Sequence, residues 1–158
     1  MQVSGSVKHP LRVAFVAVVL GMASWPAAAQ ITLIGFIKTV SPDAEMLVDG
    51  QTFKAQVGMP LQSGFRIRTG AQGALGVTLR DNTLISFGPN SEFTLDEYQY
   101  VPAKDELKLS GSMFRGTMQY VSGFIAKLKP DSVSIKTPKG VLGLRGTRVL
   151  LQVDEENP

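Results

Sequence analysis

The chain has 158 residues, a formal net charge of +3 and no cysteine. The absence of cysteine excludes disulfide bonds, cysteine nucleophiles and a lipid anchor on cysteine. The length suits one domain that buries a core of its own, and no linker or low-complexity run divides it.

The first thirty residues have the three parts of a secretory signal peptide. Lys8 and Arg12 supply the positive start, the run 13–23 is apolar, and Ala27-Ala28-Ala29 forms a small-residue cleavage site before Gln30. The apolar run is shorter than the ~20 residues of a membrane-spanning helix. We therefore expect cleavage near Ala29–Gln30 and a periplasmic or secreted protein with no stable membrane span. An uncleaved anchor is the alternative.

Removal of residues 1–29 changes the chemistry that the chain offers. It takes away Lys8 and Arg12, which leaves the chain nearly neutral, and it takes away His9, the single histidine. Without His and Cys, neither a Ser-His-Asp site nor a typical zinc site can form. The small net charge also argues against a nucleic-acid partner. No cofactor and no metal are therefore expected.

The mature chain begins with apolar, β-branched residues, which predict a first strand over 30–40. Gly35 within it indicates a bulge or a close backbone approach, and Ser41-Pro42-Asp43 predicts a turn. Asp49-Gly50 then stands between two strand-like runs, which favours a two-residue type I′ hairpin.

The stretch 64–95 is the clearest β pattern in the chain. Short runs with apolar residues at alternate positions are separated by turn clusters every eight to twelve residues, as in antiparallel hairpins. We expect Gly70, Gly73 and Gly88 to supply the positive φ that tight turns need. Pro89 sets φ for a further turn and cannot lie in a central strand.

Beyond Leu95 the pattern is looser. The run 96–105 predicts a loop or strand edge, 114–120 a strand, and 122–129 the single helix, with Ser122 as its cap and Phe124, Ile125 and Leu128 as its apolar stripe. Strands over 133–137 and 148–153 complete the domain. The fold class is all-β: antiparallel hairpins rolled into a sandwich or short β-solenoid, with one domain over 30–153 and a polar tail over 154–158.

Two blocks of the chain resemble the running pattern of the FecR-type periplasmic domain, over roughly residues 40–153. The second block consists of Ile135-Lys136-Thr137-Pro138 followed by Leu144-Arg145-Gly146-Thr147-Arg148-Val149. One departure is Asn82, where the family usually has Gly; Asn also tolerates the left-handed conformation. The first block consists of Leu61-Gln62-Ser63-Gly64-Phe65, Arg68-Thr69-Gly70, Ala74 to Leu79, Asp81-Asn82-Thr83, Pro89-Asn90-Ser91 and Phe93-Thr94-Leu95.

The resemblance implies a sensor module. FecR-type proteins are inner-membrane regulators whose periplasmic part senses a ligand-loaded outer-membrane receptor and signals to an extracytoplasmic sigma factor. We expect this chain to correspond to the periplasmic part alone, docked on another envelope protein: an outer-membrane receptor or a membrane regulator. The family motif residues Thr137, Pro138, Arg145, Gly146 and Thr147 are expected to have structural roles, with Arg145 bonding buried backbone carbonyls.

The residues themselves offer few sites for chemistry. Arg66 and Arg68 share one strand face and form a candidate partner or ligand surface, although a solvated face is the simpler reading. Tyr98 and Tyr100, together with Tyr120, are candidates to line a sugar groove, although such tyrosines more often cover a sheet edge.

The adjacent acids Asp96-Glu97 and Asp105-Glu106 would point to opposite faces of a strand, which argues against a glycosidase pair. Three glycines at a spacing of three, in 70–76 and again in 140–146, match no phosphate-binding loop and indicate turns and bulges.

These observations favour a non-enzymatic interaction or sensor module of the FecR type. The alternative is a carbohydrate- or peptidoglycan-binding domain, which would use Tyr98 and Tyr100. A hydrolase that works without histidine is a third hypothesis, and no motif in the chain selects its residues.

Overall fold

The computed structural model describes residues 32–154, which lie within one compact unit. The expected signal peptide and the tail beyond Asp154 fall outside these residues. The described elements are β1 (Leu33–Val40), β2 (Ala44–Val48), β3 (Gln51–Lys54), β4 (Pro60–Gln62), β5 (Arg66–Thr69), β6 (Leu75–Leu79), β7 (Leu84–Phe87), β8 (Glu92–Val101), η1 (Pro102–Lys104), β9 (Glu106–Val121), α1 (Phe124–Leu128), η2 (Pro130–Ser132), β10 (Val133–Thr137), β11 (Gly140–Gly143) and β12 (Arg148–Val153).

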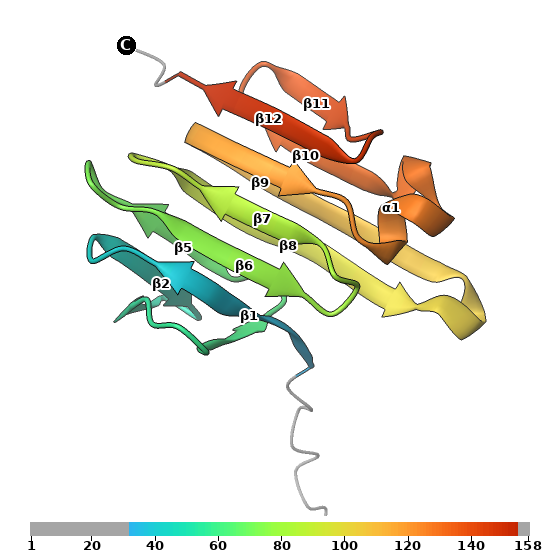
Figure 1. Ribbon diagram of the computed structural model, residues 1–158, viewed down its shortest axis with the longest axis horizontal. Helices are drawn as coiled ribbons and strands as arrows, with labels where there is room; N and C mark the ends of the chain where they lie inside the picture. The colour runs from blue at the N-terminus through green and yellow to red at the C-terminus, as the bar shows by residue number, and fades with distance from the viewer. Residues whose placement is uncertain (1–31, 155–158) are drawn as a thin grey trace, which may run out of the picture. The chain divides into compact units, whose positions relative to one another are not determined.

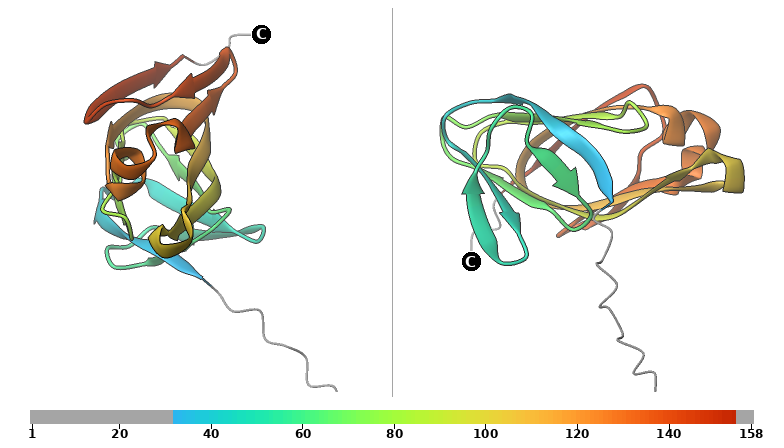
Figure 2. Two further views of the ribbon diagram at one scale, coloured as in Figure 1. Left: turned by 90° about the vertical axis from the view of Figure 1, so that its right-hand side faces the viewer. Right: turned by 90° about the horizontal axis from the view of Figure 1, so that it is seen from below.

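The strands form one curled, almost entirely antiparallel sheet of twelve strands, which confirms the all-β fold with a single short helix (Figure 1). One layer has the order β4-β1-β6-β7-β9-β12, and the other has the order β3-β2-β5-β8-β9-β10-β11. The sixteen-residue strand β9 belongs to both layers. Helix α1 lies across one end of the curl (Figure 2).

Strand β9 passes from one layer to the other at Gly116. Residues up to Arg115 pair with β8, whereas those from Gly116 onwards pair with β12. Gly116 has φ +90, and a Cβ there would overlap Ser91, so both its conformation and its close approach require glycine. This bend places the two layers face to face around a shared core.

The core is built from the inward residues of both layers and is closed by the helix. Its largest fully buried side chains include Phe65 and Phe93 from one layer, Ile85 from the other, and Tyr120 from the second half of β9. The rings of Phe87 and Phe93, from opposite layers, lie with their centroids 5.0 Å apart. Ile125 of α1 is fully buried and closes this core at its end.

Several local predictions are confirmed. Asp49 and Gly50, with φ values of 50 and 77, form the two-residue turn between β2 and β3 that a type I′ hairpin requires. Asn82 is left-handed with φ 63. At Gly35 the pairing of β1 shifts register, and a Cβ there would overlap the Thr78 carbonyl oxygen, so the bulge and the close approach coincide.

The expectation for three turn glycines is wrong. Gly70, Gly73 and Gly88 do not have positive φ. They are needed for space instead: a Cβ at Gly70 or Gly73 would overlap Asp43, and one at Gly88 would overlap the Thr117 hydroxyl. At Gly73 the overlap is with backbone atoms, so no side chain fits there, whereas at Gly70 and Gly88 it is with the side chains of Asp43 and Thr117.

The region after Leu95 differs from its prediction in three respects. Most of 96–105 continues strand β8, because a register shift between Leu95 and Glu97 restores pairing with β9. Helix α1 is capped by Gly123 without a side-chain hydrogen bond, so Ser122 is not its cap, and the stripe is only partly buried because Phe124 and Leu128 are exposed. Strand β11 was not anticipated, nor was the parallel pairing of β10 with β9.

Candidate functional site

Three arginines converge on one carboxylate on the outer face of β5, β8 and β9. Arg68 donates a hydrogen bond from its Nη2 to Glu92 Oε1 at 3.1 Å, and the guanidinium of Arg66 lies 3.5 Å from the same oxygen. Arg115 approaches Glu92 Oε2 at 3.6 Å. The cross-strand register creates this cluster, because Arg68 and Arg115 both face Glu92 from neighbouring strands. The predicted pairing of Arg66 and Arg68 on one strand face is thus present in the structure.

An exposed aromatic ring adjoins this cluster. Phe114 on β9 is 42% exposed, and the Arg66 guanidinium lies 5.0 Å from its ring centroid, a cation–π geometry. Arg66 is also held by a 3.0 Å hydrogen bond from its Nε to the Thr94 hydroxyl. We call Arg66, Arg68, Glu92, Phe114 and Arg115 the arginine face.

The electrostatics of the arginine face are mixed. Glu92 is 16% exposed in its side chain, so three cations share one largely buried anion. A neighbouring shallow hollow of about 240 Å³ adds two more acids, Asp43 and Glu45, beside Arg68 and Arg115. Because positive and negative side chains alternate here, this surface is better suited to contact with a protein that also carries both signs of charge than to binding a free anion.

The tyrosine groove is not present. Tyr98 is 9% exposed, and its hydroxyl donates to Asp81 Oδ1 at 3.1 Å, so its ring belongs to the core. Tyr100 is half-buried against the same core, and Tyr120 is fully buried. None of the three offers the exposed ring face on which a sugar could stack.

The second motif block is divided between the strands β10 and β12 and the turns and loop at their ends. The Thr137 hydroxyl donates to the Gly140 carbonyl at 3.0 Å across the turn that contains Pro138, and Gly146 has φ +135. The Thr147 carbonyl accepts the Ser122 N–H at 3.0 Å.

The expected role of Arg145 is wrong. Its guanidinium is exposed and pairs with the Asp131 carboxylate, so it does not bond buried carbonyls. Leu144 beside it points into the core and turns Arg145 outward.

The first motif block forms two buried polar clusters. In one, the Asp81 carboxylate accepts hydrogen bonds from the Thr83 hydroxyl at 2.7 Å and from the backbone N–H of Ile125 at 3.2 Å. In the other, the Thr69 hydroxyl bonds the Gly88 carbonyl at 2.7 Å and accepts the Ser91 N–H at 2.8 Å. Both clusters tie turns to distant strands, so these motif residues build the fold.

Burial changes the acidity of two tyrosines. Burial of Tyr98, reinforced by the charge of Asp81, raises its pKa well above the ordinary value, because both disfavour the phenolate. Burial raises the pKa of Tyr120 to about 12. Both phenols therefore stay neutral to a higher pH than an exposed tyrosine would, as expected of core side chains.

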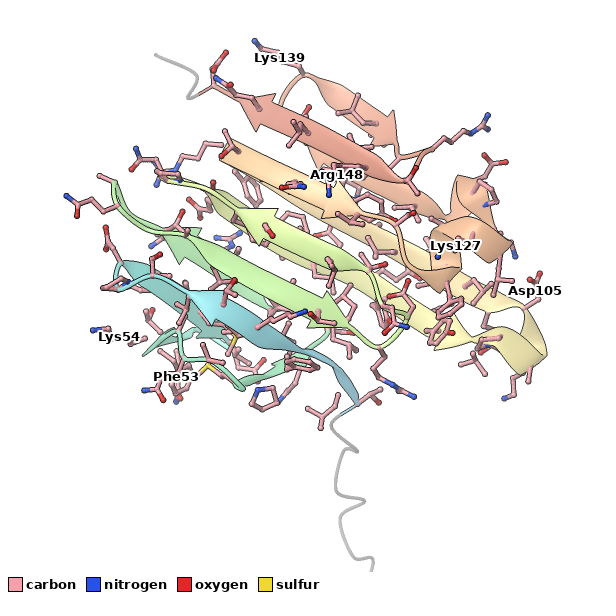
Figure 3. All side chains as sticks on the ribbon, in the orientation of Figure 1. Phe53, Lys54, Asp105, Lys127, Lys139 and Arg148 are labelled. Atoms are coloured by element: carbon pink, nitrogen blue, oxygen red, sulfur yellow. The ribbon has the colours of Figure 1, made fainter. Side chains whose placement is uncertain are left out.

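Three of the four acids in the adjacent pairs have separate polar partners. Asp96 accepts a hydrogen bond from Ser112 at 2.7 Å, whereas Glu97 pairs with Lys108 at 2.8 Å. Asp105 pairs with Lys129 at 2.9 Å, near the end that carries α1 (Figure 3). Within residues 32–154 no cluster of acidic, His or Cys side chains could hold a metal ion, and no helix there is long and apolar enough to span a membrane.

Sequence reasoning missed three members of the arginine face. Glu92, Phe114 and Arg115 join Arg66 and Arg68 only through the pairing of β8 with β5 and β9. The one available signal was the polar, charged character of Glu92 directly before a buried Phe93. A single sequence gives no register between strands so far apart in the chain.

A comparison with protein families supports the resemblance of the sequence pattern. A family model described as FecR protein matches residues 65–158, more than half of the chain. No curated protein and no solved structure matches the chain.

Proposed function

Because the chain belongs to the FecR protein family, whose domains are of the regulator and sensor type, we propose that it is a non-enzymatic interaction module that docks on another envelope protein. The proposed partner is an outer-membrane receptor or a membrane regulator. The site that would bind this partner is the arginine face.

The observation that carries the proposal is the exposed Phe114 next to a fixed arginine. Arg and aromatic side chains are the residue types that most often supply binding energy at protein interfaces. Arg66 is held by Thr94, Glu92 and the Phe114 ring, so little side-chain freedom would be lost on binding. A preordered surface that carries both signs of charge suits another folded protein.

The absence of an assembled catalytic group supports the non-enzymatic part of the proposal. Residues 32–154 contain neither His nor Cys. A hollow of about 470 Å³ between β7, β9 and β12 has no charged lining side chain. Its polar lining residues are Ser86, Thr117, Gln119 and Gln152. A broad panel of ester and glycoside substrates would show turnover if this part of the proposal were wrong.

The experiment that tests docking places a photo-crosslinking phenylalanine analogue at position 114 in cells. We expect adducts with one envelope protein, and we expect Arg66→Ala with Arg68→Ala to reduce their yield. The matched control is position 36, because Phe36 on β1 is 47% exposed but lies in the other layer. Equal adducts at both positions, or none at 114, would contradict the proposal.

We place the mature protein in the periplasm or outside the cell, following the predicted signal peptide. Fractionation and N-terminal sequencing test this directly. A mature chain that begins at Gln30 in the periplasmic or extracellular fraction is the expected result. A chain that retains residues 1–29 and stays with the membrane would support the uncleaved anchor.

A further inference from the structure

Four strands in the described part of the chain pair on one side only, and β12 is the least protected of them. Natural sheet edges avoid unwanted pairing by short length, proline, charge or bulges. Strand β4 has three residues and begins with Pro60, β3 ends with Lys54, and β11 has glycine at both ends. Strand β12 has six residues without Pro or Gly, and its only charge is Arg148 at the first position.

The outer edge of β12 is regular and open. All six residues pair with β9 in continuous register, so the opposite edge presents an uninterrupted row of backbone groups. Leu150 is 76% exposed. The end of β12 borders a cavity of about 350 Å³ whose other wall is β11, with exposed Val141 and Leu142. Another strand could therefore reach this edge.

The sequence along this edge is complementary to itself. In an antiparallel pair related by a two-fold axis, facing side chains share one side of the sheet, so the axis must pass through a residue and not between two. With the axis at Leu151, the inward residues Val149 and Val153 face each other and the outward Leu150 faces Gln152. The same register places Arg148 opposite Asp154.

The charges select this register. Neither Arg148, at the start of β12 (Figure 3), nor Asp154, just after its end, has an ion pair within residues 32–154; Asp154 accepts one hydrogen bond, from the Gln152 amide at 3.0 Å. An axis at Leu151 would form two equivalent Arg148–Asp154 pairs, one on each side. An axis at Leu150 would place Arg148 opposite Gln152 and Asp154 opposite Gly146, which leaves both charges without a facing partner.

We propose that β12 pairs with β12 of a second copy of this chain, antiparallel and centred on Leu151. The layer that ends in β12 would then join the same layer of the second copy into one continuous sheet. The partner is identified by the edge itself: a strand of the same length, with apolar residues at the same alternate positions and opposite charges at its two ends. The dimer surface centres on β12 and adjoins the arginine face at Arg115, which lines a hollow of about 310 Å³ together with Gln152 and Asp154.

The first test measures the mass of the full chain, purified as the cell processes it, by sedimentation across a range of concentrations. We expect a reversible dimer. Arg148→Asp or Asp154→Arg alone brings like charges together and should raise the dimer dissociation constant by about tenfold or more. The combined reversal Arg148→Asp with Asp154→Arg should restore wild-type dimerisation. Both positions are exposed, so circular dichroism should show that all variants are folded.

The second test determines the register with a short thiol crosslinker. The chain has no native cysteine, so only the introduced cysteines can react. A mixture of Leu150→Cys and Gln152→Cys chains should crosslink more efficiently than either variant alone, because these two positions face each other. A monomer at all concentrations, no rescue by the double reversal, or capture of β12 by a different protein while the chain alone stays monomeric would overturn the proposal. None of these results bears on adducts formed at position 114, so the two proposals fail independently.

Discussion

The Tyr98 hydroxyl and Asp81 bond each other twice: the hydroxyl donates to Asp81 Oδ1 at 3.1 Å and accepts the Asp81 backbone N–H at 2.9 Å. Both residues are buried, and the Asp81 carbonyl also accepts the Phe124 N–H at 2.7 Å. One aspartate therefore joins the β6–β7 turn, strand β8 and the start of helix α1. The cost of burying its carboxylate is offset by hydrogen bonds from four donor groups.

Replacement of this aspartate should destabilise the whole domain. Asp81→Ala leaves the Tyr98 and Thr83 hydroxyls and the Ile125 N–H without their acceptor inside the protein, so we expect a loss of about 3 kcal/mol or more in the free energy of unfolding. Urea denaturation measures it. Glu106→Ala, at an exposed position, is the control and should change stability by less than about 0.5 kcal/mol. Equal small effects at both positions would show that the Asp81 bonds contribute little.

The buried tyrosines should make the domain sensitive to alkali. The unfolded chain ionises its tyrosines near pH 10, whereas burial raises the pKa of Tyr120 in the folded chain to about 12. The folded state therefore keeps a proton that the unfolded state releases, so stability is complete below pH 10 and falls as pH rises towards 12. Tyr120→Phe should reduce this slope by up to about 1.4 kcal/mol per pH unit. Denaturation at several alkaline pH values measures it, and identical slopes in both proteins would contradict the prediction.

The bend of β9 should tolerate no side chain at Gly116. Gly116→Ala combines backbone strain at φ +90 with overlap of the new Cβ with Ser91, and we expect it to cost about 3 kcal/mol or to prevent folding. Gly50→Ala separates the two causes, because Gly50 has φ +77 but no atom within 4 Å of a new Cβ. That variant should lose only about 1 kcal/mol. Similar losses at both positions in thermal denaturation would mean that the contact with Ser91 is unimportant.

Glu92 should hold its three arginines together against their mutual repulsion. Glu92→Gln removes the shared anion, and since the guanidinium groups are partly exposed we expect a loss of only about 1 kcal/mol. Salt should restore part of this loss by screening the repulsion. Glu97→Gln, on the same strand and paired with one lysine, should cost a few tenths of a kcal/mol. A Glu92→Gln variant that salt further destabilises would contradict this account.

Local chemistry made part of the fold predictable. The Asp49-Gly50 hairpin, the left-handed Asn82, the bulge at Gly35 and the short helix near 122–129 all follow from what individual residues can do with their backbone. Each depends on neighbours within a few positions. Such features can therefore be predicted from the local sequence alone.

Features that depend on pairing between distant strands could not be predicted in the same way. The bulge between Leu95 and Glu97 reverses which residues of β8 point inward, and it therefore carries Tyr98 into the core. The arginine face likewise depends on a register that no local pattern specifies. The prediction that Arg145 bonds buried carbonyls failed because Leu144, and not Arg145, occupies the buried position of this loop.

The continuity of β9 through Gly116 also bears on how the domain fluctuates. Opening of either layer must break pairing along the same backbone, since β8 and β10 contact its first half while β7 and β12 contact its second. Amide protons of β5 and β8 should therefore exchange with solvent in the same cooperative opening as those of β6 and β7. The domain would lose its structure as a single unit, so a partner that stabilises one layer would slow exchange in the other.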